Sequence, residues 1–236
     1  MNPKHVFVAL SAFALAIPAH ADAPQPSTAQ TPAGQTSAPV TATPSVPTLA
    51  TDVRPVLIGS TLPKINLRDT MGKVFDLNAS VAKKPAVLIF YRGGWCPFCN
   101  IHLAQLRETE EPLKKLGYNI LAISPDSAAK LGETAANNKL GYTLLSDSSM
   151  AASRALGIAF RLDDATAKKY RDYGIDLEKS SGYTHHQLPA PAVFLVGRDG
   201  VIHFSYVNPN YQVRLAPEVL LAAARAYRSD ALKAPQ

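Results

Sequence analysis

The chain has 236 residues, of which 47% are hydrophobic and 18% charged, as expected for a soluble globular protein with one domain or a small pair. It contains two cysteines, too few for a small domain held together by several disulfides. The net charge of +6 is spread over scattered basic pairs rather than one run, so no nucleic-acid binding is expected.

The first 21 residues have the three parts of a secretory signal peptide. Lys4 and His5 precede an apolar run over residues 6–17, and Ala19-His20-Ala21 has the small-x-small pattern of a cleavage site. A helix of this length rises about 18 Å, less than the bilayer core of about 30 Å. We therefore expect a signal peptide at residues 1–21, a location in the periplasm or secretion beyond it, and no stable membrane insertion.

Residues 22–53 are predicted to be a disordered linker rich in proline, threonine and alanine. Six prolines lie between Pro24 and Pro47, and they interrupt any periodic hydrophobic pattern. Such a segment buries too little apolar surface to offset the entropy lost on ordering. The globular domain is accordingly predicted over residues 54–236.

The strands of this domain are indicated by short apolar runs. A hairpin is predicted at residues 64–67 and 73–75, extending the front of the domain. The uninterrupted apolar run at residues 85–91 is typical of a central strand buried on both faces. Further strands are predicted at residues 119–123, at residues 142–145, and in a hairpin over residues 192–196 and 201–206.

Helices are predicted between these strands. Cys99, Leu103, Leu106, Leu113 and Leu116 share one helical face, although Pro112 should interrupt that helix near Glu110. Other helices are predicted from a cap at residues 124–126 through 137, at 149–156, on the polar surface at 163–173, and at 217–229. This alternation predicts an α/β domain with a central mixed sheet flanked by helices and an N-terminal β-hairpin extension.

Both cysteines lie in one stretch, Cys96-Pro97-Phe98-Cys99, at the junction of a buried strand and a helix. The start of a helix has unpaired N–H groups and a partial positive charge, which stabilise a thiolate and lower its pKa. Two thiols on the first turn can also close a disulfide and reopen it by exchange. The motif therefore indicates redox chemistry.

Two other uses of the pair are less favoured. A structural disulfide here would close a loop of only four residues, where the stabilisation is smallest. A metal site needs further ligands, and the adjacent His185 and His186 lack the usual ligand spacing. We expect no bound metal and no cofactor.

Two segments then resemble a known family. Residues 90–99, FYRGGWCPFC, and residues 188–200, LPAPAVFLVGRDG, resemble the AhpC/TSA (alkyl hydroperoxide reductase and thiol-specific antioxidant) group of peroxiredoxin-like proteins. The resemblance covers about residues 56–228 and implies a thioredoxin-like fold. It places Pro191 at the cis-proline that faces the cysteine pair, with neighbouring backbone groups free for a substrate peptide. The similar segment 208–215 makes Tyr211 and Arg214 candidates for lining the site.

The chain also departs from the peroxiredoxin pattern Pro-x-x-x-Thr-x-x-Cys. Aligning Cys99 with the peroxidatic cysteine puts Cys96 at the threonine and Arg92 at the proline. The peroxide-activating arginine of the family is replaced near Pro191, which leaves Arg92 or Arg214 as substitutes. A thioredoxin interpretation makes Cys96 the attacking thiol, a peroxiredoxin interpretation makes it Cys99, and Trp95 is expected to pack beside the loop.

The leading hypothesis is an exported thiol–disulfide oxidoreductase that cycles a Cys96–Cys99 dithiol and disulfide. The alternative is a thiol-dependent peroxidase, a peroxiredoxin that reduces hydroperoxides. A third hypothesis is a periplasmic copper-delivery protein that adds His185 or His186 to the two cysteines. The expected partners are a protein or small-molecule disulfide or peroxide and an external thiol reductant.

Overall fold

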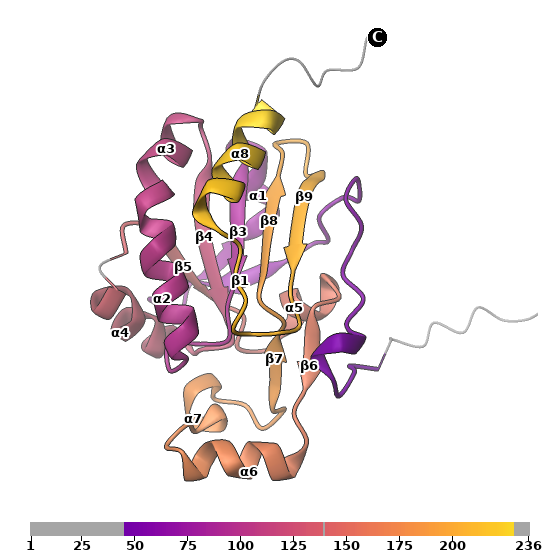
Figure 1. Ribbon diagram of the computed structural model, residues 1–236, viewed down its shortest axis with the longest axis vertical. Helices are drawn as coiled ribbons and strands as arrows, with labels where there is room; N and C mark the ends of the chain where they lie inside the picture. The colour runs from indigo at the N-terminus through magenta and orange to yellow at the C-terminus, as the bar shows by residue number, and fades with distance from the viewer. Residues whose placement is uncertain (1–44, 139, 229–236) are drawn as a thin grey trace, which may run out of the picture. The chain divides into compact units, whose positions relative to one another are not determined.

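A seven-stranded mixed sheet forms the centre of the computed structural model, which describes residues 45–138 and 140–228 (Figure 1). The strand order is β2-β1-β5-β4-β3-β8-β9. The strands are β1 (Asn66–Arg68), β2 (Val74–Asp76), β3 (Ala86–Phe90), β4 (Asn119–Ser124), β5 (Thr143–Ser146), β8 (Ala192–Val196) and β9 (Ile202–Val207). The predicted signal peptide and linker residues 22–44 lie outside the described residues.

The sheet is mixed, as predicted. Strands β3, β4 and β5 run parallel, whereas β8 is antiparallel to β3 and β9 is antiparallel to β8. The predicted N-terminal hairpin is β1 and β2, which extend the sheet beyond β5. Since the parallel strands end at the same edge, the residues that follow β3 and β4 meet there.

Strand β3 is buried along its whole length because helices cover both faces of the sheet. Its side chains alternate between two hydrophobic clusters: Val87 and Ile89 face one, and Leu88 and Phe90 face the other. Such a strand reads as an uninterrupted apolar run rather than an alternating one.

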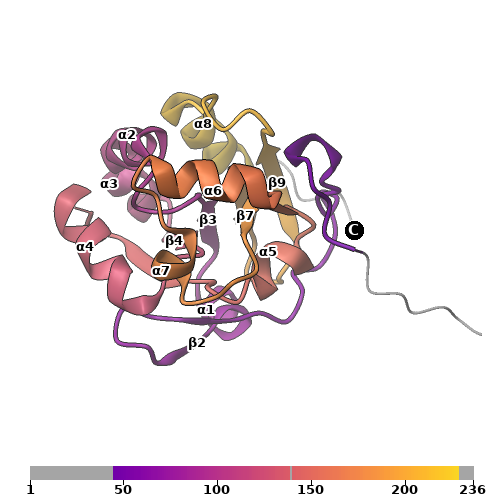
Figure 2. The ribbon, with the colours of Figure 1, turned by 90° about the horizontal axis from the view of Figure 1, so that it is seen from below.

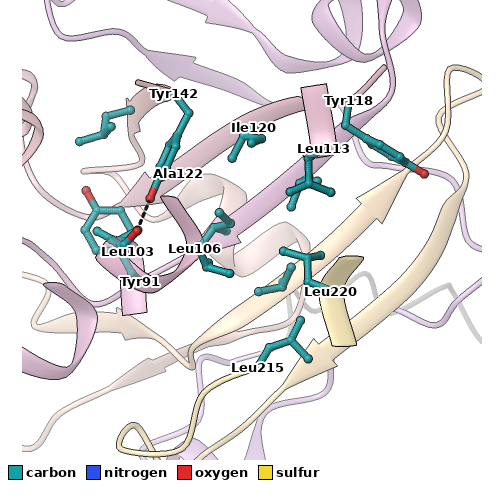
Figure 3. Packing of buried hydrophobic residues seen from close by; sticks show 14 of the residues in the cluster. Tyr91, Leu103, Leu106, Leu113, Tyr118, Ile120, Ala122, Tyr142, Leu215 and Leu220 are labelled. Carbon is teal, nitrogen blue, oxygen red and sulfur yellow. Dashed lines mark hydrogen bonds between the residues drawn. The ribbon is translucent and has the colours of Figure 1, made fainter. Parts of the chain in front are cut away.

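One face of the sheet is covered by α2 (Pro97–Leu106), α3 (Glu110–Lys115), α4 (Ala128–Asn138) and α8 (Pro217–Arg228). The other is covered by α1 (Leu77–Lys83) and α5 (Ala151–Ala155). Figure 3 shows the first cluster, in which the Tyr142 hydroxyl donates a 3.0 Å hydrogen bond to the carbonyl of Leu103. The helix predicted to be interrupted by Pro112 ends as α2, continues as the 3-10 helix η2 (Arg107–Thr109), and restarts as α3 with Pro112 in its first turn.

A segment between β5 and β8 contains a second sheet that the sequence did not predict. Strands β6 (Ala159–Arg161) and β7 (Gln187–Pro189) pair antiparallel and flank α6 (Asp164–Asp172) and α7 (Leu177–Ser181). The strands are three residues each, too short for a recognisable alternation. Figure 2 shows α6, the polar surface helix that was predicted, crossing the end of the sheet.

Residues 45–53 differ from the expected linker. They include the 3-10 helix η1 (Ala50–Asp52), the Pro47 carbonyl accepts a 2.7 Å hydrogen bond from the Arg161 N–H, and Val53 is buried beside Phe160 and Leu188. The folded part therefore begins before the predicted boundary at residue 54. The sequence could not show this, because the contacts are with residues more than 100 positions away. No helix in the described part of the chain is long and apolar enough to cross a membrane.

Candidate active site

The loop that carries the first cysteine follows β3 directly and is fixed at several points. The Gly94 N–H donates to Asp126 Oδ2 at 2.8 Å, and Asn100 Nδ2 donates to the Gly94 carbonyl at 2.8 Å. Gly93 has a φ of 141°, and a Cβ atom there would lie 2.3 Å from Nε1 of Trp95. Only glycine fits this close approach, so the loop conformation depends on it.

Cys96 is the N-cap residue of α2, and Pro97 follows at the first helical position. The Cys96 carbonyl accepts from the N–H groups of Cys99 and Asn100, at 3.0 and 3.1 Å. Both thiols are free and nearly inaccessible, with Cys96 1% and Cys99 0% exposed. The predicted placement of the pair at a strand-to-helix junction is confirmed.

The two thiols differ in acidity. A hydrogen bond from the Cys99 thiol lowers the pKa of Cys96 to about 6, and the Cys99 backbone N–H and the charges of Arg92 and Arg214 act in the same direction. Burial raises the pKa of Cys99, and its interaction with Cys96 raises it further. Cys96 is thus the better thiolate and Cys99 the better proton donor.

Arg214 contacts the deeper cysteine: its Nη2 donates to Cys99 Sγ at 3.3 Å. The segment that carries Arg214 is fixed by a hydrogen bond at the next residue, where Nε2 of His102 lies 3.2 Å from the Leu215 carbonyl. Burial lowers the pKa of His102 to about 4, so its ring is neutral at pH 7 and Nε2 donates to that carbonyl. The resemblance made Arg214 a candidate for lining the site, and in the structure its guanidinium contacts Cys99.

Arg92 lies inside a ring of aromatic side chains and is only 4% exposed. Its guanidinium carbon is 4.1 Å from the ring centre of Tyr211, 5.3 Å from that of Trp95 and 5.6 Å from that of Tyr170. Its Nη2 donates to the Tyr170 hydroxyl. Trp95, Arg92 and Tyr211, which the sequence offered as separate candidates, therefore lie together in the structure.

Asp126 lies under the loop, although it was predicted to cap the following helix. It follows β4, and it accepts from the Gly94 N–H and, at 3.0 Å, from the Ser124 hydroxyl. Burial raises the pKa of Asp126 to about 6. The signal that could have found it is topological, since it follows the strand that neighbours β3 in a parallel sheet.

Sequence reasoning also missed Tyr170 and His102. Tyr170 belongs to α6, whose polar composition indicated only a surface helix. His102 is one turn beyond Cys99 on α2, a spacing that could have placed it on the same face. Neither residue stands out by type, because tyrosine and histidine are common on helices without any role.

The expectation of a cis-proline at Pro191 was wrong, because the peptide bond before it is trans. The Ala190 N–H donates to the Ile158 carbonyl, and the Pro191 carbonyl accepts from the Asn208 N–H. The backbone that the resemblance assigned to a substrate peptide is thus used within the fold. The two partners are Ile158, just before β6, and Asn208, just after β9, so no local pattern around Pro191 could show them.

The histidine pair does not join the cysteines. His185 Nε2 lies 2.8 Å from the Ser148 carbonyl, and His186 Nε2 lies 2.7 Å from Glu178 Oε1. Among the described residues, no group of three or more histidine, cysteine or acidic side chains is arranged to hold a metal ion. The copper-delivery hypothesis therefore has no ligand set within this part of the chain.

The AhpC/TSA family profile matches residues 58–205. A putative peroxiredoxin Q of chloroplasts from Oryza sativa subsp. indica is 28% identical over 190 residues, which cover 78% of this chain and 77% of that protein. Peroxiredoxin Bcp of Escherichia coli strain K12 is 33% identical over 95 residues, which cover 40% of this chain and 60% of that protein.

Solved structures share the fold. The peroxidoxin BcpB of Mycobacterium tuberculosis superposes with a TM-score of 0.57 at 20% identity, over 73% of this chain and 98% of that one. The peroxiredoxin Q of Xanthomonas campestris gives a TM-score of 0.55 at 20% identity, over 75% of this chain and 99% of that one. At this identity the likeness establishes the thioredoxin-like fold that was predicted.

Proposed function

Because the chain belongs to the AhpC/TSA family, we propose that this oxidoreductase is a thiol peroxidase that reduces hydroperoxides through Cys96 and Cys99. The relatives named peroxiredoxins support this activity over general disulfide exchange, the leading sequence-based hypothesis. The observation that carries the proposal is an acidic thiol, Cys96, packed against a neutral one and next to two arginines.

The burial of the pair favours a small substrate. Cys96 is 1% exposed, so a protein disulfide would need a large opening of the site, whereas hydrogen peroxide is little larger than water. The backbone beside Pro191 is already hydrogen-bonded within the fold and offers no edge to a substrate peptide. Both features support peroxide reduction.

In the proposed cycle the Cys96 thiolate attacks one oxygen of the hydroperoxide. The O–O bond breaks, a sulfenic acid forms on Cys96, and the leaving oxygen takes a proton from solvent and departs as an alcohol or water. The charges of Arg92 and Arg214 stabilise the thiolate and the negative charge that develops on the leaving oxygen.

Resolution uses the second thiol. Cys99 attacks the Cys96 sulfenic sulfur, a disulfide forms, and hydroxide leaves with the thiol proton as water. An external dithiol then exchanges with this disulfide and returns both cysteines to the reduced state. The raised pKa of Cys99 keeps its proton in place until that step.

Mixing the reduced protein with hydrogen peroxide tests the activity. We expect thiol loss well above the rate of a free thiol of the same pKa, no fast reaction in Cys96→Ser, and a trapped sulfenic acid after one turnover in Cys99→Ser. A fast reaction that survives in Cys96→Ser would make Cys99 the peroxidatic residue. Peroxide consumption no faster than that of the free thiol would leave disulfide exchange, the second candidate, to be assayed with a model disulfide.

Disulfide exchange remains the second candidate because a Cys-x-x-Cys pair at a helix start can perform it. Mixed disulfides accumulating on Cys99→Ser with a model substrate, without fast peroxide reduction, would support it. We also propose export to the periplasm from the features of residues 1–21. Cell fractionation and N-terminal sequencing of the mature chain test this, with a start at Asp22 expected.

A further inference from the structure

Basic pairs that are scattered in the sequence come together at one end of the sheet. Strands β3 and β4 begin at this end, β8 finishes there beside the start of β3, and Cys96 follows β3 at the opposite end. Figure 1 shows the last turns of α3 and α8 and the β8–β9 turn at the same end. We call it the basic end, and its positively charged residues are Lys83, Lys84, Lys114, Lys115, Arg198, Arg225 and Arg228.

Acidic residues at the basic end do not balance this charge. Helices α1 and α3, the last turn of α8 and the β8–β9 turn contain three of them, Glu110, Glu111 and Asp199, against the seven basic residues. Seven positive and three negative side chains leave four positive charges in excess, out of a net charge of +6 for the whole chain. Most of the net charge therefore lies at this end.

An open pocket of about 330 Å³ lies at the basic end. Its wall combines residues just before β3 and β4 with the β8–β9 turn and the end of α8, and it includes Tyr118, Arg198, Asp199, His203, Tyr227 and Arg228. Glycine shapes part of the wall, since a Cβ atom at Gly197 would lie 2.5 Å from both Asp199 Oδ1 and His203 Nε2. The volume is within the range of about 300–1,000 Å³ that is typical of small-molecule sites.

Arg198 and Arg228 line this pocket without an acidic partner. Within residues 45–138 and 140–228, no carboxylate oxygen lies within 4.0 Å of a nitrogen of either side chain. Arg198 Nε donates to the Ala82 carbonyl at 3.4 Å, and Nη2 of Arg228 packs over Gly117, 3.5 Å from where a Cβ atom would lie. Most of their N–H groups are therefore available to a ligand.

Asp199 is the one acidic residue in the described wall of the pocket, and it is already engaged. Its Oδ1 accepts a 3.0 Å hydrogen bond from the Val201 N–H and lies 3.6 Å from His203 Nε2. Two guanidinium groups, charged at every physiological pH, thus face one carboxylate. A cleft lined with an excess of one charge concentrates ions of the opposite charge. The pocket is therefore suited to an anion.

The helix macrodipole explains only part of this arrangement. Basic residues in the last turn of a helix are favoured by the partial negative charge there, which accounts for Lys83, Lys115 and Arg225. It does not account for Arg198, which lies between two strands, or for a pocket that brings Arg198 beside Arg228.

We propose that this pocket binds a phosphate group. Arg198 and Arg228 each donate to phosphate oxygens, and Tyr227, 37% exposed, offers a ring surface to the rest of the ligand. A phosphate group has up to three terminal oxygens and two negative charges, enough for two guanidiniums, whereas a carboxylate has two oxygens and one charge. The five residues of β3 span about 17 Å between this end and the cysteine pair, so binding is independent of the proposed peroxide reduction.

Isothermal titration calorimetry of the full chain, in phosphate-free buffer near pH 7.5 and at about 0.15 M salt, tests the site. The probes are glycerol 3-phosphate, a monoester, and glycerophosphoglycerol, a diester that matches a phospholipid head group without its acyl chains. We expect one-to-one binding with a Kd below about 1 mM for at least one probe. Arg198→Gln and Arg228→Gln should each raise this Kd roughly tenfold, because each removes charge-assisted hydrogen bonds.

Arg225→Gln is the matched control, because it removes the same charge from the same helix and Arg225 is not part of the pocket wall. It should change the Kd by less than about twofold, since salt screens a diffuse surface charge. Tighter binding of the monoester would identify a free phosphorylated molecule as the ligand, and tighter binding of the diester a lipid head group. Absence of saturable binding for both probes, or an equal loss in Arg225→Gln, would overturn the proposal.

Chemical modification gives a second measurement that needs no variant. Phenylglyoxal, a neutral reagent, modifies arginine side chains, and mass spectrometry of the peptides follows each arginine separately. The tighter probe, at about ten times its Kd, should slow modification of Arg198 and Arg228 roughly tenfold and leave Arg225 unchanged. Equal protection of all three arginines, or protection of none, would contradict a defined pocket.

Discussion

Cys96 and Cys99 differ at the scale of single residues because one caps a helix and the other lies inside it. The Cys96 thiol is held at a pKa of about 6, so the thiolate forms above that pH and is lost as pH falls through it. We expect the ultraviolet absorbance of the reduced protein to show one thiolate titrating near pH 6. The same titration should be absent in Cys96→Ser, since burial raises the pKa of Cys99.

Arg92 and Arg214 should both affect the pH at which the Cys96 thiolate forms. Arg92→Gln and Arg214→Gln each remove a positive charge that lowers the pKa of Cys96, so the thiolate titration should move to higher pH in both. The peroxide reaction should slow by roughly 100-fold at a pH where the thiol is fully ionised, because the leaving oxygen also loses a stabilising charge. An unchanged titration in both variants would contradict the contact geometry.

Asp126 makes the stability of the fold depend on pH. Its pKa rises from 3.8 in the unfolded chain to about 6 in the folded protein. The protonated carboxyl stabilises the fold fully below about pH 4, and this contribution, about 3 kcal/mol, is lost as pH rises through 6. Asp126→Asn should therefore gain stability over the native chain at pH 8 but not at pH 4, measured by urea unfolding.

Asp164→Asn is the control for this experiment, because that side chain is 83% exposed and should alter stability little at either pH. Equal effects of Asp126→Asn at pH 4 and pH 8 would show that the carboxyl does not change protonation across this range. Because the Gly94 N–H bonds to Asp126 Oδ2, the amide oxygen of asparagine can replace that acceptor.

At the scale of elements, α6 acts on the site through one hydroxyl. Tyr170 packs edge-to-face on Trp95 and accepts from Arg92. Tyr170→Phe keeps the packing and removes the acceptor, so we expect a loss of about 2 kcal/mol in the free energy of unfolding. Tyr173→Phe, at the C-cap of the same helix and 69% exposed, should change it by less than about 0.5 kcal/mol. Equal losses would argue against an Arg92–Tyr170 bond.

The loop that follows β3 packs against α4, and two glycines near this contact should respond to alanine substitution in opposite directions. A Cβ at Gly94 would lie 2.0 Å from Oγ1 of Thr134, whereas a Cβ at Gly132, inside α4, would meet nothing within 4 Å. Gly94→Ala should destabilise the protein and slow peroxide reduction, because the loop must move. Gly132→Ala should stabilise it by up to about 1 kcal/mol by raising helix propensity, with activity unchanged. Thermal unfolding and the peroxide assay measure both.

At the scale of the described chain, the sheet separates two hydrophobic clusters. Ile120 belongs to the cluster under α2 and α8, and Ile158 to the cluster under α1 and α5. Each isoleucine-to-valine change should cost about 0.5–1.5 kcal/mol, and the double variant should show the sum within about 0.5 kcal/mol. A larger coupling energy in denaturant unfolding would mean that the two clusters relax together across the sheet.

Much of the fold could be predicted because its signals lie in contiguous residues. The apolar run that became β3, the turn between β8 and β9, and the helical spacing that buries Cys99, Leu103 and Leu106 each depend on neighbours in the chain. The short strands β6 and β7 could not be found, since three residues contain no readable period. The packing of residues 45–53 against the region of Phe160 and Arg161 could not be predicted either, because composition carries no information about partners that are distant in sequence.

The same distinction holds for the site. The sequence by itself determined the cysteine pair, its place at the start of a helix, and the family, since a motif and a strand end are local. Only the tertiary structure decided what surrounds the pair, because the surrounding residues are distant in sequence. Asp126 is 32 residues beyond its partner Gly94, and Tyr170 is 78 residues beyond Arg92. Arg214 is 115 residues beyond Cys99. Burial and charge pairing depend on all neighbours in space, so the acidity of each thiol and the unpaired arginines exist only in the folded chain.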